Sequence, residues 1–185
     1  IFILGLIALT PFVVDSPYYM GIIILTTLYI FAGISWNIVA GFAGQLLIAH
    51  ISFFAIGAYG TIVLANNLGV SPWIGIPLSG GMAAILGLIV AFITLRYGLK
   101  MDYFALFSIA LMVALKTIFT KWRLVGGAVG IWVQLQDVGF STFIFENKEP
   151  YLYIALVLTL AGLIIQYRIY HSKMGKYFMA IREDE

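Results

Sequence analysis

One long stretch of the sequence constrains the fold more than any other feature. Residues 16–95 contain no Asp, Glu, Lys or Arg. Soluble domains carry about 25% charged residues, so a soluble segment of this length would hold about 20 charges. No soluble core hides so long a segment without a charged face. Across all 185 residues, 63% are hydrophobic and only 10% are charged, and the sequence therefore predicts an integral membrane protein.

Composition and missing motifs exclude several classes of function. The chain has no cysteine, which excludes a disulfide framework, a cysteine-ligated zinc site and a thiol nucleophile. Its net charge of +2 is too small to suggest a nucleic-acid partner. Nucleotide-binding and hydrolase motifs are missing, and the two histidines, His50 and His171, lie in different environments. We therefore predict no catalytic residue, metal or cofactor, and expect any energy source to belong to another subunit.

Proline, glycine and charged positions divide the chain into six apolar segments. A helix needs about 20 apolar residues to cross the hydrocarbon core. Five segments are long enough: residues 18–40, 45–65, 72–95, 103–121 and 150–167. Residues 1–14 are too few to cross, and we expect them to end a helix that begins upstream in a longer polypeptide. The predicted fold is an all-α integral membrane protein, a polytopic helix bundle with about six membrane segments.

The positions of the basic residues predict how these segments are oriented. If the C-terminal tail is cytoplasmic, the turn at residues 96–100 is cytoplasmic as well. That side then holds six of the ten basic residues, namely Arg96, Lys100, Arg168, Lys173, Lys176 and Arg182. The opposite side holds three basic and four acidic residues, namely Lys121, Arg123, Lys148, Asp15, Asp137, Glu146 and Glu149. Whether residues 41–65 cross the membrane or re-enter it stays open, and re-entry would reverse the orientation upstream.

A pair of glycines predicts a break in a membrane helix. Gly41 and Gly44 lie three residues apart, with the polar residues Asn37, Gln45 and His50 on either side. Irregular backbone at membrane depth is tolerated only where it is buried in protein or lines a wet cavity. These five residues are therefore our candidates for a translocation pathway. The alternative is that the polar side chains only form hydrogen bonds between helices and fix the fold.

Three further features have both a functional and a structural interpretation. A stripe of small residues, on which another helix can pack, is formed by Ala83, Gly87 and Ala91. This contact could be an interface that moves during transport or a static one, and we favour the static interpretation. Lys116 lies within a predicted span, and we expect it to snorkel to the outer interface rather than act as a functional charge. The glycine-rich run at 126–130 lacks the Lys-Ser/Thr ending of a phosphate loop, and we interpret it as a flexible turn outside the membrane.

The C-terminal residues have an amphipathic helical pattern. Met174, Tyr177, Phe178 and Ile181 recur at the spacing of one helix face, and the basic residues lie elsewhere. Because this pattern directly follows a membrane segment, it predicts a helix at the cytoplasmic surface. The apolar face could rest on lipid or dock in a groove of a soluble partner, and the pattern does not distinguish the two.

Three blocks of sequence carry a resemblance to a known family. They are NIVAGFAGQ (37–45) with FFAIGAY (53–59), DYFAL (102–106) with LVGGAVGI (124–131), and SKMGK (172–176) with AIREDE (180–185). In order and spacing they resemble the membrane permeases of branched-chain amino acid ABC importers, in the LivM-like branch of the LivH/LivM family. Two positions depart from the family pattern. ALMVA (110–114) lacks the usual Glu, and Val125 replaces the Thr of a Thr-Gly-Gly motif.

The resemblance implies a subunit that forms half of a pathway for branched-chain or similar small amino acids. Residues 1–169 would be an incomplete transmembrane permease domain, and residues 170–185 a cytoplasmic tail leading into the ATPase-coupling loop. The implied coupling residues are Gly175, Ala180, Ile181, Arg182, Glu183, Asp184 and Glu185. The implied partners are a second permease subunit, cytoplasmic ATPase subunits that bind ATP, an extracytoplasmic solute-binding protein and membrane lipid.

Two other functions fit the sequence, and the location follows from the resemblance. A related importer for urea, amides, sugars or nucleosides is the first alternative, because the membrane motifs do not encode the solute. A structural subunit of a membrane complex, without a pathway of its own, is the second. In the transport interpretations we expect a multi-pass protein of a bacterial or archaeal cytoplasmic membrane.

Overall fold

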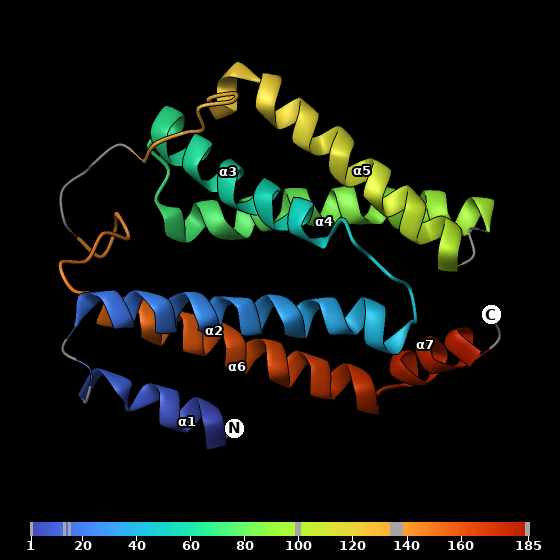
Figure 1. The fold of residues 1–185 in the computed structure, drawn as a ribbon, viewed down its shortest axis with the longest axis horizontal. Coiled ribbons are helices and arrows are strands. Elements are labelled where there is room, and N and C mark those ends of the chain that lie inside the picture. The colour runs from blue at the N-terminus through green and yellow to red at the C-terminus, as the bar shows by residue number, and fades with distance from the viewer. Residues whose placement is uncertain (1, 13, 15, 99–100, 134–138, 184–185) are drawn as a thin grey trace. The chain divides into compact units, whose positions relative to one another are not determined.

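The computed structural model describes residues 2–12, 14, 16–98, 101–133 and 139–183. The regular structure in these ranges is helical, apart from one antiparallel bridge between Gly139 and Ile144. The helices are α1 (Phe2–Ala8), α2 (Pro17–Asn37), α3 (His50–Leu68), α4 (Pro72–Tyr97), α5 (Met101–Lys121), α6 (Glu149–His171) and α7 (Lys173–Glu183). Three short turns of other helix types accompany them: η1 (Thr10–Phe12), η2 (Ile38–Phe42) and η3 (Arg123–Val125) (Figure 1).

Five of these helical stretches are long and apolar enough to cross a membrane. They are Pro17–Phe42, His50–Leu68, Pro72–Tyr97, Asp102–Lys121 and Glu149–His171. This confirms the predicted all-α polytopic membrane fold and five of its six segments. Residues 1–14 contain instead the seven-residue helix α1 and the turn η1. A helix of seven residues extends only about 10 Å, so this segment does not cross by itself.

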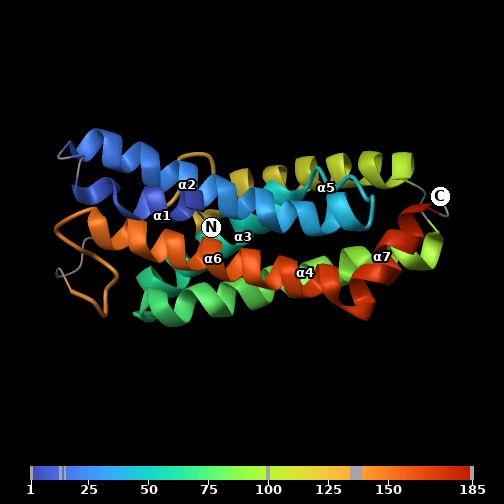
Figure 2. The same cartoon turned by 90° about the horizontal axis from the view of Figure 1, so that it is seen from below.

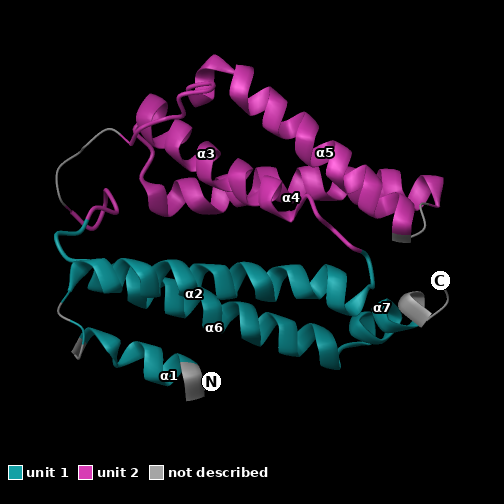
Figure 3. Cartoon of the chain, in the orientation of Figure 1, with its two compact units in different colours: residues 1–45, 145–185 teal, residues 46–144 magenta. Residues whose placement is uncertain are grey.

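The chain divides into two compact units (Figure 3). Unit 1 consists of residues 1–45 and 145–185, and unit 2 of residues 46–144. In unit 1, α2 and α6 lie side by side and run in the same direction, as Figures 1 and 2 both show. Their contact is built from small residues. The hydroxyl of the fully buried Thr159 donates to the carbonyl of Ala155 at 2.7 Å and lies 3.3 Å from that of Thr27, and a Cβ at Gly162 would lie 3.1 Å from the Phe31 ring.

Small residues also hold α3 against α4 in unit 2. A Cβ at Gly60 would lie 3.0 Å from the Cβ of Ser79, and one at Gly75 would lie 3.2 Å from Cγ2 of Thr61. Backbones approach this closely in membrane bundles because only small residues separate them. The α3–α4 hairpin is therefore held by complementary shape over much of its length.

The predicted packing stripe is displaced along α4. Ala83 and Gly87 are half-buried, and a Cβ at Gly87 would lie 3.8 Å from the Phe53 ring of α3. Ala91, however, is exposed, and the buried face continues through Val90 and Thr94. Residues four apart on an α-helix turn by about 400°, so a row with this spacing drifts by about 40° at each step. The drift carries the third predicted position away from α3.

The parallel arrangement of α2 and α6 addresses the open question of residues 41–65. Lys148, before α6, donates from Nζ to the carbonyl of Pro17 at the start of α2 (2.9 Å). At the other end, the rings of Phe42 and Tyr170 lie 5.6 Å apart. Both helices thus begin on one side of the membrane and end on the other, so an odd number of crossings must separate them. If α4 and α5 each cross, α3 crosses too, and the re-entrant alternative fails.

Candidate functional site

The glycine break follows the end of α2. Asn37 is the last residue of α2, and Gly41 lies in η2, one wider turn of π-helix. A Cβ at Gly41 would lie 2.9 Å from Cγ of Asn37, so this amide covers the glycine. Gly44 has a φ of +71°, a conformation that non-glycine residues rarely adopt. Residues 44–47, including Gln45, are not helical, so the chain does break where the two glycines predict.

The depth of this break differs from the prediction. The stretch Pro17–Phe42 contains 26 residues, which as a helix extends about 39 Å and exceeds the hydrocarbon core of about 30 Å. The break therefore lies where a complete span ends, and not at the middle of the membrane. Asn37, Gly41, Gly44 and Gln45 belong to unit 1, whereas His50 begins α3 in unit 2. Only the first four form a single described group.

Helix α7 packs against the end of α6 through a compact turn. The Ser172 hydroxyl accepts from the Gly175 amide at 3.3 Å, as an N-cap residue does. The same hydroxyl donates to the carbonyl of Ile169 at 2.7 Å. Gly175 is buried, and a Cβ there would contact the carbonyl oxygen of Ile169 and lie 2.9 Å from that of Tyr170. Gly175, which the resemblance implied for ATPase coupling, thus also has a packing role.

The apolar face of α7 is largely uncovered on this chain. Met174 is 62% exposed and Tyr177 is 68% exposed, whereas Phe178 is half-buried. Ala180 is exposed. The backbone of Ile181, Arg182 and Glu183 completes α7, and the predicted coupling residues Asp184 and Glu185 lie outside the described residues. Helix α7 also contacts η2, which ends two residues before Gly44.

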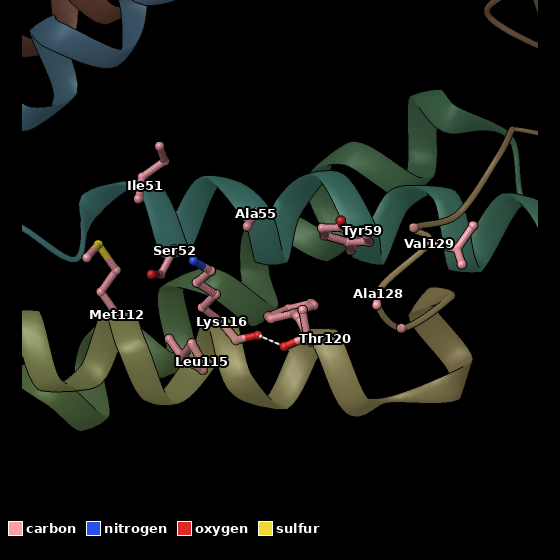
Figure 4. A pocket seen from close by; sticks show the side chains of 13 residues that line it. Ile51, Ser52, Ala55, Tyr59, Met112, Leu115, Lys116, Thr120, Ala128 and Val129 are labelled. Atoms are coloured by element: carbon pink, nitrogen blue, oxygen red, sulfur yellow. Dashed lines mark hydrogen bonds between the residues drawn. The ribbon is translucent and has the colours of Figure 1, made fainter.

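Unit 2 contains a cavity that sequence reasoning did not predict. It has a volume of about 530 Å³ and lies among α3, α5 and the glycine-rich run that follows η3. Figure 4 shows side chains from α3 and α5 directed toward one another across it. Its lining is mainly apolar, with a few hydroxyl groups and one cation: Ile51, Ser52, Ala55, Tyr59, Met112, Leu115, Lys116, Phe119, Thr120 and residues 127–130.

Lys116 points into this cavity. Figure 4 shows its amino group directed at α3, on the side of Ser52 and away from Thr120. Helical side chains lean toward the N-terminus of their helix, which here carries the ammonium group away from Lys121 and the nearest membrane surface. We had expected Lys116 to snorkel to the outer interface, but in this structure its side chain points away from that end of α5. Lys116 lies five residues before the end of α5, and a charged side chain within a membrane span usually pairs with an anion or faces a water-filled cavity.

The glycine-rich run closes one end of the cavity as a defined loop. Gly126, Gly127 and Gly130 all have positive φ angles, of +77°, +58° and +83°. A Cβ at Gly126 would contact the Gly130 carbonyl group and lie 3.0 Å from the Ile131 amide nitrogen. The loop thus folds tightly back on itself, and the preceding Val125 is buried. These residues form a turn, as the sequence predicted; its flexibility stays a prediction.

These features define a class of protein. The described residues build a multi-pass α-helical membrane protein, and one of its units has a cavity lined by a single basic residue, Lys116. In the other unit, a helix break lies beside a partly uncovered amphipathic helix. Among the same residues, no group of three or more His, Asp or Glu side chains could hold a metal ion.

Comparison with known proteins assigns the chain to a family within this class. The family model described as "Branched-chain amino acid transport system / permease component" matches residues 18–185. The chain belongs to this family of transporter membrane components.

Two curated relatives are similar over nearly the whole chain. The high-affinity branched-chain amino acid transport system permease protein LivM of Escherichia coli (strain K12) is 29% identical over 210 residues, which cover 98% of this chain and 49% of the relative. The protein of the same name from Salmonella typhimurium (strain LT2) is 29% identical over 198 residues, covering 95% of this chain and 46% of the relative. The chain spans about half the length of these relatives. No solved structure matches it significantly.

Proposed function

We propose that this chain is the permease subunit, or part of it, of an ABC importer for branched-chain or similar small amino acids. It would form half of the transmembrane pathway and catalyse no reaction itself. ATP would bind and be hydrolysed in separate subunits. Family membership over residues 18–185 and the names of both relatives support this proposal.

One structural observation carries the mechanism: α7 lies against the helix break. The uncovered Met174 and Tyr177 offer a soluble partner an apolar helix face. The opposite side of α7 is fixed to α6 through Ser172 and Gly175, and α7 also contacts η2. A displacement of α7 by an ATPase would therefore act on η2 and on Gly44, where the chain passes from unit 1 to unit 2.

The proposal includes the remaining components of such a system. A second permease subunit would complete the pathway, and an extracytoplasmic solute-binding protein would deliver the amino acid. The surrounding lipid would be that of a bacterial or archaeal cytoplasmic membrane. The end of α6 with Arg168, and the following α7 with Lys173 and Lys176, would face the cytoplasm, following the excess of basic residues there.

A glycine substitution tests the role of the break. Gly44→Leu places a branched side chain at a φ of +71°, which costs roughly 1–2 kcal/mol for an L-residue. We expect this variant to insert normally but to lose uptake of labelled leucine in the assembled transporter. Gly33→Leu is the matched control, because a Cβ at Gly33 meets nothing within 4 Å. Normal uptake by the Gly44 variant would refute a role for the break in transport.

A crosslinking experiment tests the role of α7. A photoreactive residue in place of Arg182 should label a copurified ATPase subunit, whereas labelling of lipid alone would favour an interfacial helix. Uptake of a panel of labelled solutes would separate amino acids from urea, amides, sugars and nucleosides. No solute flux after reconstitution with the ATPase would support the structural-subunit alternative.

A further inference from the structure

We propose that the cavity of unit 2 is an amino acid site in which Lys116 binds the carboxylate of the transported solute. This inference rests on the proposed function, because it assigns a substrate contact to a transport pathway. The cavity will be called the Lys116 cavity, defined by the lining residues of α3, α5 and the loop at 127–130.

The first argument is the charge itself. The ammonium group of Lys116 points toward Ser52, in the first turn of α3 (Figure 4). None of the residues that line the cavity in the described part of the chain is acidic. Lys116 is exposed on this chain but lies within a helix long and apolar enough to cross a membrane. A cation within a membrane span pairs with an anion or faces a water-filled path. A solute that carries a carboxylate would supply the missing negative charge.

The second argument is the shape and polarity of the remaining wall. A volume of about 530 Å³ lies within the range of about 300–1,000 Å³ that is usual for small-molecule sites. Met112, Leu115 and Phe119 provide an apolar surface on α5. The Phe119 ring packs 5.1 Å from that of Tyr59 on α3, which closes the apolar wall between the helices. An aliphatic side chain fits this surface, whereas a polyhydroxylated sugar would lose hydrogen bonds to water there.

The third argument concerns the ammonium group of an amino acid. Thr120 and Tyr59, which carry hydroxyl groups, are among the residues that line the cavity. The Thr120 hydroxyl donates its own proton to the carbonyl of Lys116 at 2.6 Å, so its lone pairs are left to accept from a ligand. Aromatic faces also attract cations. The cavity thus offers one fixed cation, neutral acceptors and an apolar wall, which together match an aliphatic α-amino acid.

Cysteine protection measures occupancy of this site directly. These 185 residues contain no cysteine, so Ala128→Cys introduces a single thiol into them, and labelling is read on the peptide that contains residue 128. Labelling of this thiol by a maleimide should be slowed by L-leucine and by 4-methylpentanoate, which keeps the carboxylate but lacks the amine. The amine 3-methylbutan-1-amine and inorganic phosphate should protect far less. Equal protection by the amine would overturn the carboxylate assignment, and equal protection by phosphate would indicate a general anion site instead.

Variants of the lysine then identify the binding group. Lys116→Met removes the charge at similar length, and the concentration of leucine needed for half protection should rise at least about tenfold, the usual effect of losing a charge-assisted hydrogen bond. Lys116→Arg should restore most of the protection. Lys121→Met is the matched control, because Lys121 lies on the same helix outside the lining. Unchanged protection in Lys116→Met would refute the proposal.

The uptake assay separates this inference from the proposed function. If the parent transporter takes up leucine and Lys116→Met transports it as well as Lys121→Met does, only the Lys116 site is wrong. If the parent transporter takes up no amino acid, the proposed function itself fails.

Discussion

The tight packing of α7 on α6 makes Gly175→Ala the most informative single change in unit 1. A Cβ at this position would contact the carbonyl oxygen of Ile169 and lie 2.9 Å from that of Tyr170. These are backbone atoms of α6, so they cannot rotate away as a flexible side chain would. The added methyl group must therefore displace α7 from the end of α6.

The magnitude follows from two opposing effects. Forcing a methyl group into a filled space costs about 1–3 kcal/mol, and the rigid backbone places this case near the upper end. Alanine favours helix formation over glycine by about 1 kcal/mol. The net loss is then about 2 kcal/mol, which corresponds to about a 30-fold change in the docking equilibrium of α7.

Hydrogen exchange of the α7 amides measures this equilibrium. Helix α7 has 11 residues, and an isolated helix of this length is marginal in water, so undocking should expose its amides to exchange. We expect exchange over residues 173–183 to accelerate by about 30-fold in Gly175→Ala. Lys176→Ala is the control, because Lys176 is exposed. Equal exchange in the two variants would refute the packing argument.

Two further substitutions test the helix contacts within each unit. Gly60→Leu should separate α3 from α4, because a Cβ at Gly60 would lie 3.0 Å from that of Ser79, and should lower the free energy of unfolding by about 1–3 kcal/mol. Thermal unfolding in detergent measures this loss, and Gly80→Leu is the control because a Cβ at Gly80 meets nothing within 4 Å. Equal shifts in the two variants would show that the α3–α4 contact at Gly60 is unimportant. Thr159→Val removes a hydroxyl from the fully buried α2–α6 contact and should cost about 0.6 kcal/mol, the average for hydrogen bonds in membrane bundles. In the same assay Thr26→Val should not lower stability measurably, because Thr26 is exposed. An equal loss of stability in both variants would contradict a stabilising role for the Thr159 hydroxyl.

The membrane spans were predictable because their signals are local. Each apolar run is long enough to cross, and proline or glycine marks most of its ends, as Pro17 does for α2 and Gly69 for α3. The second span begins at His50 and not at Gln45, since Gly44 adopts a left-handed backbone and residues 44–47 are not helical. Apolarity alone does not report this conformation, so the predicted boundary was five residues early.

The Lys116 cavity could not be predicted from the pattern because it depends on contacts between distant residues. Ser52 and Thr120 are 68 positions apart, yet both line it. Lys116 lies five residues before the end of α5, so its side chain can extend either toward that end or back along the helix. Two signals were nonetheless present: a charge inside an apolar span, and three glycines in the run at 126–130. Only the fold shows that they meet at one cavity.

The position of the glycine break changes what it can do in transport. A break at mid-membrane would bring Asn37 and Gln45 to the solute, whereas a break at the end of a complete span places them on either side of η2, the turn that contacts α7. Gly44 and Gln45 then lie in the connection from η2 to α3, away from a solute at the membrane centre. We therefore infer that the break and the Lys116 cavity divide the work of transport. In this division Gly44 variants should impair coupling to ATP hydrolysis, and Lys116 variants should impair occupancy by the solute. Each defect should leave the other property intact.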